Sequence, residues 1–234
     1  AQAYSSESVP RQVSQIRAAR SLELLAERHG RITEQWMMRI ARDHYEGTFL
    51  RGPAFDPANP DFHTLCMHVS PADFTWGNTA SGCVVELRDA PPVFWWTPGP
   101  PCNGCYVPFF VDGRRLPEIV SRAGTAGKRT VAPPDAPIDT WAPDSYWWLF
   151  RELIDRVKGD AVRSLPGYYG RRNRLVRARF DPLEQAFAAE TPAVLERYAA
   201  TGDAAVLDGF TARCVGQVEA ALAELLAEFE GADA

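Results

Sequence analysis

The sequence predicts an α+β fold in which helices and a small sheet occupy different parts of the chain. Apolar residues follow helical spacing at both ends of the 234 residues, whereas short segments rich in β-branched and aromatic residues fill the middle. Hydrophobic residues make up 46% of the chain, which supplies a sizeable core at this length. We therefore expect a single domain over residues 1–234, with helices and sheet in separate layers.

Two helices are expected in the first fifty residues. Apolar residues recur at helical spacing over residues 9–29, and Gly30 follows them as glycine does at many helix C-termini. Thr33 is the expected N-cap of a second helix that reaches about His44 and is stopped by Gly47. His44 would then lie at a helix end, where an imidazolium can interact with the helix dipole.

The middle of the chain predicts three strands, at residues 62–70, 81–88 and 92–97. The short connection at 89–92 predicts that the second and third strands form an antiparallel hairpin. Residues 113–142 are rich in Pro, Gly and Asp, which favours a long surface excursion.

The C-terminal part predicts three helices. Asp144 or Ser145 caps an aromatic-rich helix, and two more follow around the arginine-rich run at 171–179. That run is expected to be a solvated helix start, with an anion or partner patch as the alternative. The last helix carries seven apolar residues at helical spacing: Leu207, Phe210, Cys214, Val218, Leu222, Leu225 and Phe229.

Composition narrows the classes of partner. The net charge of -5 and the pI near 5.5 provide no basic field, so we expect no nucleic-acid partner. No apolar run reaches the roughly 18 to 20 residues that span a bilayer, so we expect no membrane association. The five cysteines are odd in number and irregular in spacing, which favours a free thiol and a cytoplasmic location. An export signal could nevertheless be lost with an upstream segment.

The sequence CNGC places Cys102 and Cys105 two residues apart, which raises the question of a metal or redox site. A zinc site would need two further ligands, and Cys66 with His68 is the other close pair. The CNGC pair, however, runs into an apolar strand instead of a zinc knuckle or a helix start. We therefore expect no metal and no cofactor, and we interpret the two cysteines as small apolar residues.

Residues 76–82, WGNTASG, form a turn-rich polar segment ahead of a buried strand. Such a segment can aim an asparagine amide or backbone N–H groups at a developing oxyanion. An ordinary polar turn is the alternative interpretation.

Five segments, taken in order from about Arg39 to about Val157, resemble the C-terminal half of the secernin and dipeptidase family of N-terminal-nucleophile hydrolases. A more distant similarity is to the isopenicillin N acyltransferase family. The segments are RDHYEGT, HTLCMH, NTASGCVVEL, PPVFWWTPGPPCNGCYVPFF and SYWWLFRELIDRV.

The resemblance implies a four-layer αββα sandwich in which an N-terminal Cys attacks an amide carbonyl, its own α-amino group acts as the base, and no metal takes part. Because the first residue here is Ala1, we expect the nucleophile on a companion N-terminal chain that autoproteolytic processing separates and that completes the sheet. The expected protein is a heterodimeric hydrolase of small peptides or N-acyl amines.

By motif, the resemblance assigns His68, Asn78, Thr79 and Ser81 to the substrate cleft. Asn78 is the expected contact to the oxyanion or the substrate amide, with Thr79 and Ser81 as donors behind it. Two alternatives stay open: a non-catalytic binding or assembly protein of the same fold, and a zinc-stabilised structural protein.

Overall fold

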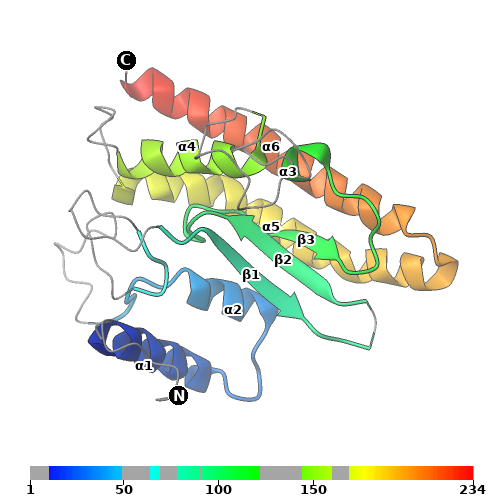
Figure 1. Ribbon diagram of the computed structural model, residues 1–234, viewed down its shortest axis with the longest axis horizontal. Helices are drawn as coiled ribbons and strands as arrows, with labels where there is room; N and C mark the ends of the chain where they lie inside the picture. Colours follow the sequence, from blue (N-terminus) through cyan, green and yellow to red (C-terminus); the bar gives the residue numbers. More distant parts are fainter. Residues whose placement is uncertain are drawn as a thin grey trace, which may run out of the picture.

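The computed structural model describes residues 11–48, 64–68, 78–89, 91–121, 144–159 and 169–233. These residues form a mixed α+β structure with six helices and one three-stranded sheet, which confirms the predicted fold class at this level (Figure 1). The elements are α1 (Arg11–Glu27), α2 (Glu34–Ala41), β1 (Ser81–Glu86), β2 (Val93–Pro98), β3 (Val107–Phe110), α3 (Glu118–Ser121), α4 (Tyr146–Lys158), α5 (Tyr169–Thr201) and α6 (Ala205–Asp233).

The sheet is antiparallel with the order β1-β2-β3. Glu86 pairs with Val93 at the ends of β1 and β2, so the predicted antiparallel hairpin is confirmed. The strand predicted at 62–70 is wrong for residues 64–68, which form bends and irregular backbone, and its other residues lie outside the described chain. Among the residues described, the backbone of this segment bonds to distant residues and not to a neighbouring strand. The Cys66 N–H donates to the Asp43 carbonyl, and the Thr79 N–H donates to the Met67 carbonyl.

Local signals account for the start of α2 but not for its end. The Trp36 N–H donates to the Thr33 hydroxyl oxygen at 3.2 Å, which confirms the N-cap of α2. Gly30 and Gly47 adopt positive φ values of 74° and 76°, which glycine tolerates without strain. The predicted end of the second helix was wrong, because α2 stops at Ala41 and leaves His44 in the loop that follows.

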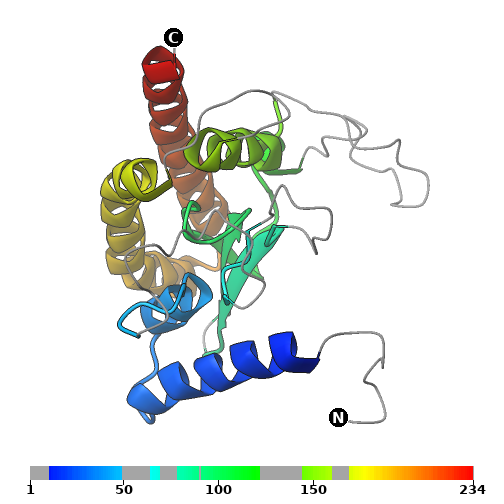
Figure 2. The ribbon, with the colours of Figure 1, turned by 90° about the vertical axis from the view of Figure 1, so that its left-hand side faces the viewer.

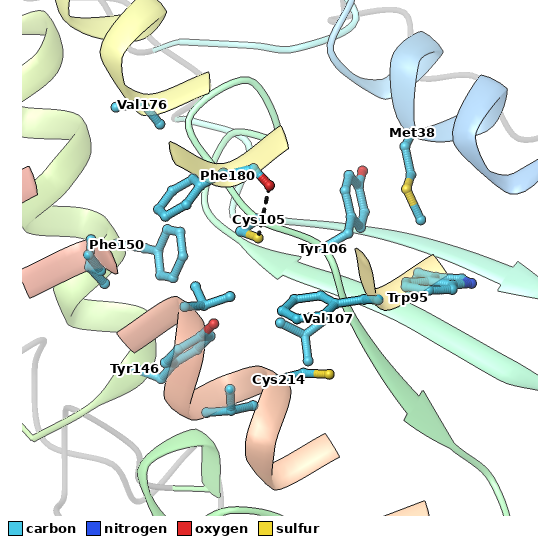
Figure 3. Packing of buried hydrophobic residues seen from close by; sticks show 14 of the residues in the cluster. Met38, Trp95, Cys105, Tyr106, Val107, Tyr146, Phe150, Val176, Phe180 and Cys214 are labelled. Carbon is cyan, nitrogen blue, oxygen red and sulfur yellow. Dashed lines mark hydrogen bonds between the residues drawn. The ribbon is translucent and has the colours of Figure 1, made fainter. Parts of the chain in front are cut away.

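A layer of long helices covers the sheet. Helix α6 packs against β3, α4 and α5, as Figures 1 and 2 show from two sides. All seven residues predicted for the inner face of α6 are buried. Around Trp95, Tyr106 and Val107 of the sheet region, the core also takes in Tyr146 and Phe150 of α4 (Figure 3).

The arginine-rich run lies in the first turns of α5, and two of its arginines bond to other segments. Arg172 is buried and donates to the Arg156 carbonyl at 2.5 Å. Arg177 donates to the Gly104 carbonyl at 2.6 Å. These two residues fix α5 to neighbouring segments, whereas Arg171, Arg174 and Arg179 are exposed, as expected for a solvated helix start.

Within the described parts of the chain, no helix combines the length and the apolar character that crossing a membrane requires.

Candidate functional site

Four buried side chains of three separate segments meet beside the sheet. His44 follows α2, Cys66 and His68 belong to the irregular segment 64–68, and Cys102 lies in the turn between β2 and β3. One nitrogen or sulfur atom of each residue lies within 4.8 Å of those of the other three. Their exposed fractions range from 0% to 4%, so the four side chains are almost fully buried.

His68 Nε2 is the atom that the other three residues approach. It lies 3.1 Å from His44 Nε2, 3.2 Å from Cys102 Sγ and 3.8 Å from Cys66 Sγ. The four residues therefore form one cluster, which we call the His/Cys cluster.

The loop after α2 is built to point His44 inward. The Asp43 carboxylate accepts two hydrogen bonds from the Arg20 side chain, at 2.7 and 2.9 Å, and one from the Tyr45 N–H at 3.0 Å. Tyr45 has a φ of 64°, which is uncommon for a bulky residue and is held by these contacts. The His44 N–H donates to Glu46 Oε2 at 2.7 Å, so the loop closes on itself around His44.

The segment that carries Cys66 and His68 is held through Met67, the residue between them. The Met67 N–H donates to the Thr79 hydroxyl oxygen at 3.0 Å, and that hydroxyl donates to the Met67 carbonyl at 3.3 Å. The Thr64 hydroxyl donates to the Cys66 carbonyl at 2.8 Å. Met67 is thus fixed on one side while its two neighbours reach the cluster.

Side chains of α5 and of Arg42, which caps the C-terminus of α2, hold the turn that carries Cys102. Arg42 donates to the Pro101 carbonyl at 2.8 Å, Asn173 to the Cys102 carbonyl at 2.9 Å, and Arg177 to the Gly104 carbonyl. The Tyr169 hydroxyl at the start of α5 donates to Cys102 Sγ at 3.1 Å. The position of the sulfur is therefore determined by contacts from outside the turn.

The charges of the cluster shift several pKa values. Burial opposes the thiolate of Cys102, but the hydrogen bond from Cys66 and the electrostatic effect of the neighbouring His68 and His44 outweigh it and hold the Cys102 pKa well below its ordinary value. Burial and the neighbouring Cys102 raise the pKa of Cys66. Burial opposes the imidazolium of His44, yet the Cys102 thiolate and Glu46 outweigh it and raise its pKa to about 9.

A cavity of about 690 Å³ lies next to the cluster. His44, Cys102 and Tyr169 form part of its wall, together with charged residues of both signs such as Glu46 and Arg177. The cluster therefore borders a space that a small molecule could enter.

The residues predicted for the cleft fall in two places. His68 is in the cluster, whereas Asn78, Thr79 and Ser81 lie just before and at the start of β1, and the cavity wall as described includes none of these three. The Thr79 side chain is bonded to Met67, Asn78 is half-buried and Ser81 is exposed. Their catalytic roles stay predictions.

The two cysteines of CNGC have different environments. Cys102 joins Cys66 and His68, which are the residues weighed above as zinc ligands. Cys105 instead faces the core, where its Sγ lies 4.0 Å from the Phe180 carbonyl oxygen of α5 (Figure 3). His44 is the member that sequence reasoning missed, because it was placed at a helix end.

The cluster has two chemical capacities. A thiolate beside an imidazolium is the arrangement of an activated cysteine nucleophile, and two cysteines with two histidines are a common ligand set for zinc. Comparisons of the chain with protein-family models, with curated proteins and with solved structures found no match. Function is therefore argued from the site and from the resemblance of individual segments.

Proposed function

We propose that the chain is a subunit of an enzyme that hydrolyses amide bonds in small peptides or N-acyl amines, with the Cys nucleophile supplied by a companion N-terminal chain. The main observation behind the proposal is that segments far apart in sequence converge on one site. Three of the five segments that resemble the hydrolase family supply His44, His68 and Cys102, and these residues meet beside one cavity. Segments far apart in sequence that share one site are typical of a functional cleft.

The cavity supports a small peptide-like substrate. Its volume of about 690 Å³ lies within the usual range for small-molecule sites, roughly 300 to 1,000 Å³. Its wall carries arginines, among them Arg42 and Arg177, and carboxylates, among them Asp43 and Glu46. A small peptide carries an ammonium group and a carboxylate group, so a cavity wall with both negatively and positively charged side chains suits it.

The exposed edge of the sheet supports the proposal of a companion chain. Among the described residues β1 pairs with β2 alone, and near its outer end Val85 is 48% exposed and Leu87 82% exposed. An edge strand with exposed apolar side chains is a template for further strands. Strands of a companion chain added at this edge would build the larger sheet of an αββα sandwich.

The proposed reaction begins when the companion's N-terminal Cys attacks the substrate amide carbonyl and its α-amino group takes the thiol proton. An α-amino group suits this role because its ordinary pKa is about 7.7 to 8.0. The amine leaves with that proton, and water then hydrolyses the thioester. In this proposal Asn78, which lies just before β1 and outside the described cavity wall, donates from its amide to the oxyanion of the tetrahedral intermediate.

The test is to express the chain together with the polypeptide encoded upstream of it and to assay the purified complex on a panel of dipeptides and N-acyl amino acids. We expect amine release by the complex, an acyl-enzyme in its intact mass, and no activity of the isolated chain. The Asn78→Ala variant should lower kcat by about 10² to 10³, whereas Cys83→Ser, on the exposed face of β1, should leave it unchanged.

Two results would contradict the proposal: hydrolysis by the isolated chain, or an inactive complex across the whole panel. N-terminal sequencing of the companion chain is an independent check. A first residue other than Cys, Ser or Thr would favour the non-catalytic binding protein instead.

A further inference from the structure

We propose that His44, Cys66, His68 and Cys102 bind one Zn²⁺ ion in a closed, structural tetrahedral site. This proposal does not depend on the hydrolase function, because zinc content is measured without any assay of activity. It changes the role of His68 from a residue of the substrate cleft to a metal ligand.

The three donor–donor distances that involve His68 Nε2 are close to the edges of a zinc tetrahedron. Zinc–nitrogen bonds near 2.0 to 2.1 Å and zinc–sulfur bonds near 2.3 Å give edges of about 3.3 Å for N–N, about 3.6 Å for N–S and about 3.8 Å for S–S. The two Nε2 atoms of His44 and His68 are 3.1 Å apart, and His68 Nε2 lies 3.2 and 3.8 Å from the two sulfur atoms. All four donor atoms lie within 4.8 Å of one another.

Hydrogen bonding alone does not account for the crowding at His68 Nε2. An imidazole nitrogen either donates one hydrogen or accepts through one lone pair, so it makes a single good hydrogen bond. His68 Nε2 nevertheless has three polar neighbours, the closest at 3.1 and 3.2 Å. A cation at the centre of the four atoms gives every lone pair the same partner.

The surroundings of Cys102 fit a metal-bound thiolate. The Tyr169 hydroxyl already donates to Cys102 Sγ, and Asn103 Oδ1 lies 3.3 Å from the same sulfur. The Asn103 Nδ2 group is buried and has no hydrogen-bond partner among the described residues. A half-turn of this amide would direct the N–H toward the thiolate, which satisfies the buried donor and gives the sulfur a second one.

The carboxylate beside His44 also suits a metal ligand. Histidines that bind zinc through one ring nitrogen commonly direct the other toward a carboxylate, which orients the ring and increases its basicity. His44 Nδ1 lies 3.5 Å from Glu46 Oε1, while Nε2 faces the cluster.

Charge balance permits the deep burial of this site. On binding, Cys66 releases its thiol proton and the His44 imidazolium releases its Nε2 proton to solvent, so that Cys66 and Cys102 bind as thiolates and both histidines bind through neutral Nε2. The two thiolates cancel the charge of the ion, so no net charge is buried. Four protein ligands complete the coordination of zinc, which is the mark of a structural site and leaves no open position for water or substrate.

The proposed role is to hold three irregular segments together. The ligands come from three segments that lack a regular pattern of backbone hydrogen bonds: the loop after α2, the segment 64–68 and the Cys102 turn. Zinc binding therefore stabilises the wall of the cavity.

The experiment measures zinc by elemental analysis in the whole protein, purified without a histidine tag and without chelator. We expect one zinc per chain in the wild type, and at least a tenfold loss in Cys66→Ser and in Cys102→Ser. The matched controls are Cys105→Ser, three residues from a ligand, and Cys83→Ser on the surface; both should keep one zinc per chain.

Two measurements on the wild type keep the proposal testable if a ligand variant fails to fold. Cobalt exchanged for zinc should give the visible d–d bands of tetrahedral Co²⁺ and thiolate charge-transfer absorption. Removal of the metal with a chelator should expose Cys66 and Cys102 to iodoacetamide, while Cys105 and Cys214 stay protected in the core. A wild type without stoichiometric zinc that also fails to bind added Zn²⁺ or Co²⁺ would overturn the proposal, as would full zinc in Cys102→Ser.

Discussion

Gly104 allows the turn that carries Cys102 to lie directly against β2. A Cβ atom at this position would lie 2.0 Å from Thr97 Oγ1 and 3.1 Å from Thr97 Cβ, and Thr97 is fully buried. Neither the turn nor the strand can shift freely, because the Gly104 carbonyl is bonded to Arg177.

We therefore predict that Gly104→Ala destabilises the protein by about 1 to 3 kcal/mol through overpacking. The matched control is Gly170→Ala in the first turn of α5, where no atom lies within 4 Å of the added Cβ. That change should be neutral, or stabilising by up to about 1 kcal/mol, because alanine is the better helix former. Urea denaturation of both variants measures the difference, and equal midpoints would contradict the close approach.

Individual residues of the cluster were only partly predictable. Cys66, His68 and Cys102 were recognised as possible ligands from residue type and spacing. Cys105 was named with them because it is near in sequence, but the chain reverses between the two cysteines and Cys105 enters the core. His44 could not be assigned, since its direction depends on the positive φ of Tyr45 and on the Arg20–Asp43 contact between distant segments.

Elements with local signals were predicted well, and elements fixed by tertiary hydrogen bonds were not. The inner face of α6, the cap of α2 and the hairpin of β1 and β2 each follow from periodicity, a cap residue or a tight turn. The segment 64–68 has the composition of a strand, yet Asp43 and Thr79 take its backbone groups. Composition alone does not reveal which partner a backbone group will find.

The capping of α2 gives a prediction for this element. Thr33→Ala removes the acceptor for the Trp36 N–H and should lower the free energy of unfolding by about 1 kcal/mol. Thr33→Ser keeps the hydroxyl and should retain most of that stability. Thermal and urea unfolding of the two variants measure the effect; an equal loss in both would show that the methyl group, and not the cap, is responsible.

At the scale of the whole molecule, one carboxylate links the cluster to the helical layer. Glu184 of α5 accepts from Arg42 at 2.5 Å, from the Tyr106 N–H at 2.7 Å and from Arg177 at 3.4 Å. The two arginines in turn bond carbonyls of the Cys102 turn. Glu184 therefore connects the end of α2, the entry to β3 and α5, which are distant in sequence.

We predict that Glu184→Ala costs about 3 to 5 kcal/mol, because it removes the carboxylate partner of Arg42, leaves Arg177 with Asp181 as its one carboxylate partner in the described chain, and leaves the Tyr106 N–H without its acceptor. Glu184 is only 12% exposed, so solvent screens this network weakly. The control is Glu190→Ala on the same helix, whose ion pair with Arg213 joins side chains that are 42% and 45% exposed. Such a surface pair contributes about 1 kcal/mol or less. Urea denaturation of the two variants separates these cases. Equal losses would mean that the Glu184 network does not join the helical layer to the turn, and that the turn depends on its own contacts and on the proposed zinc.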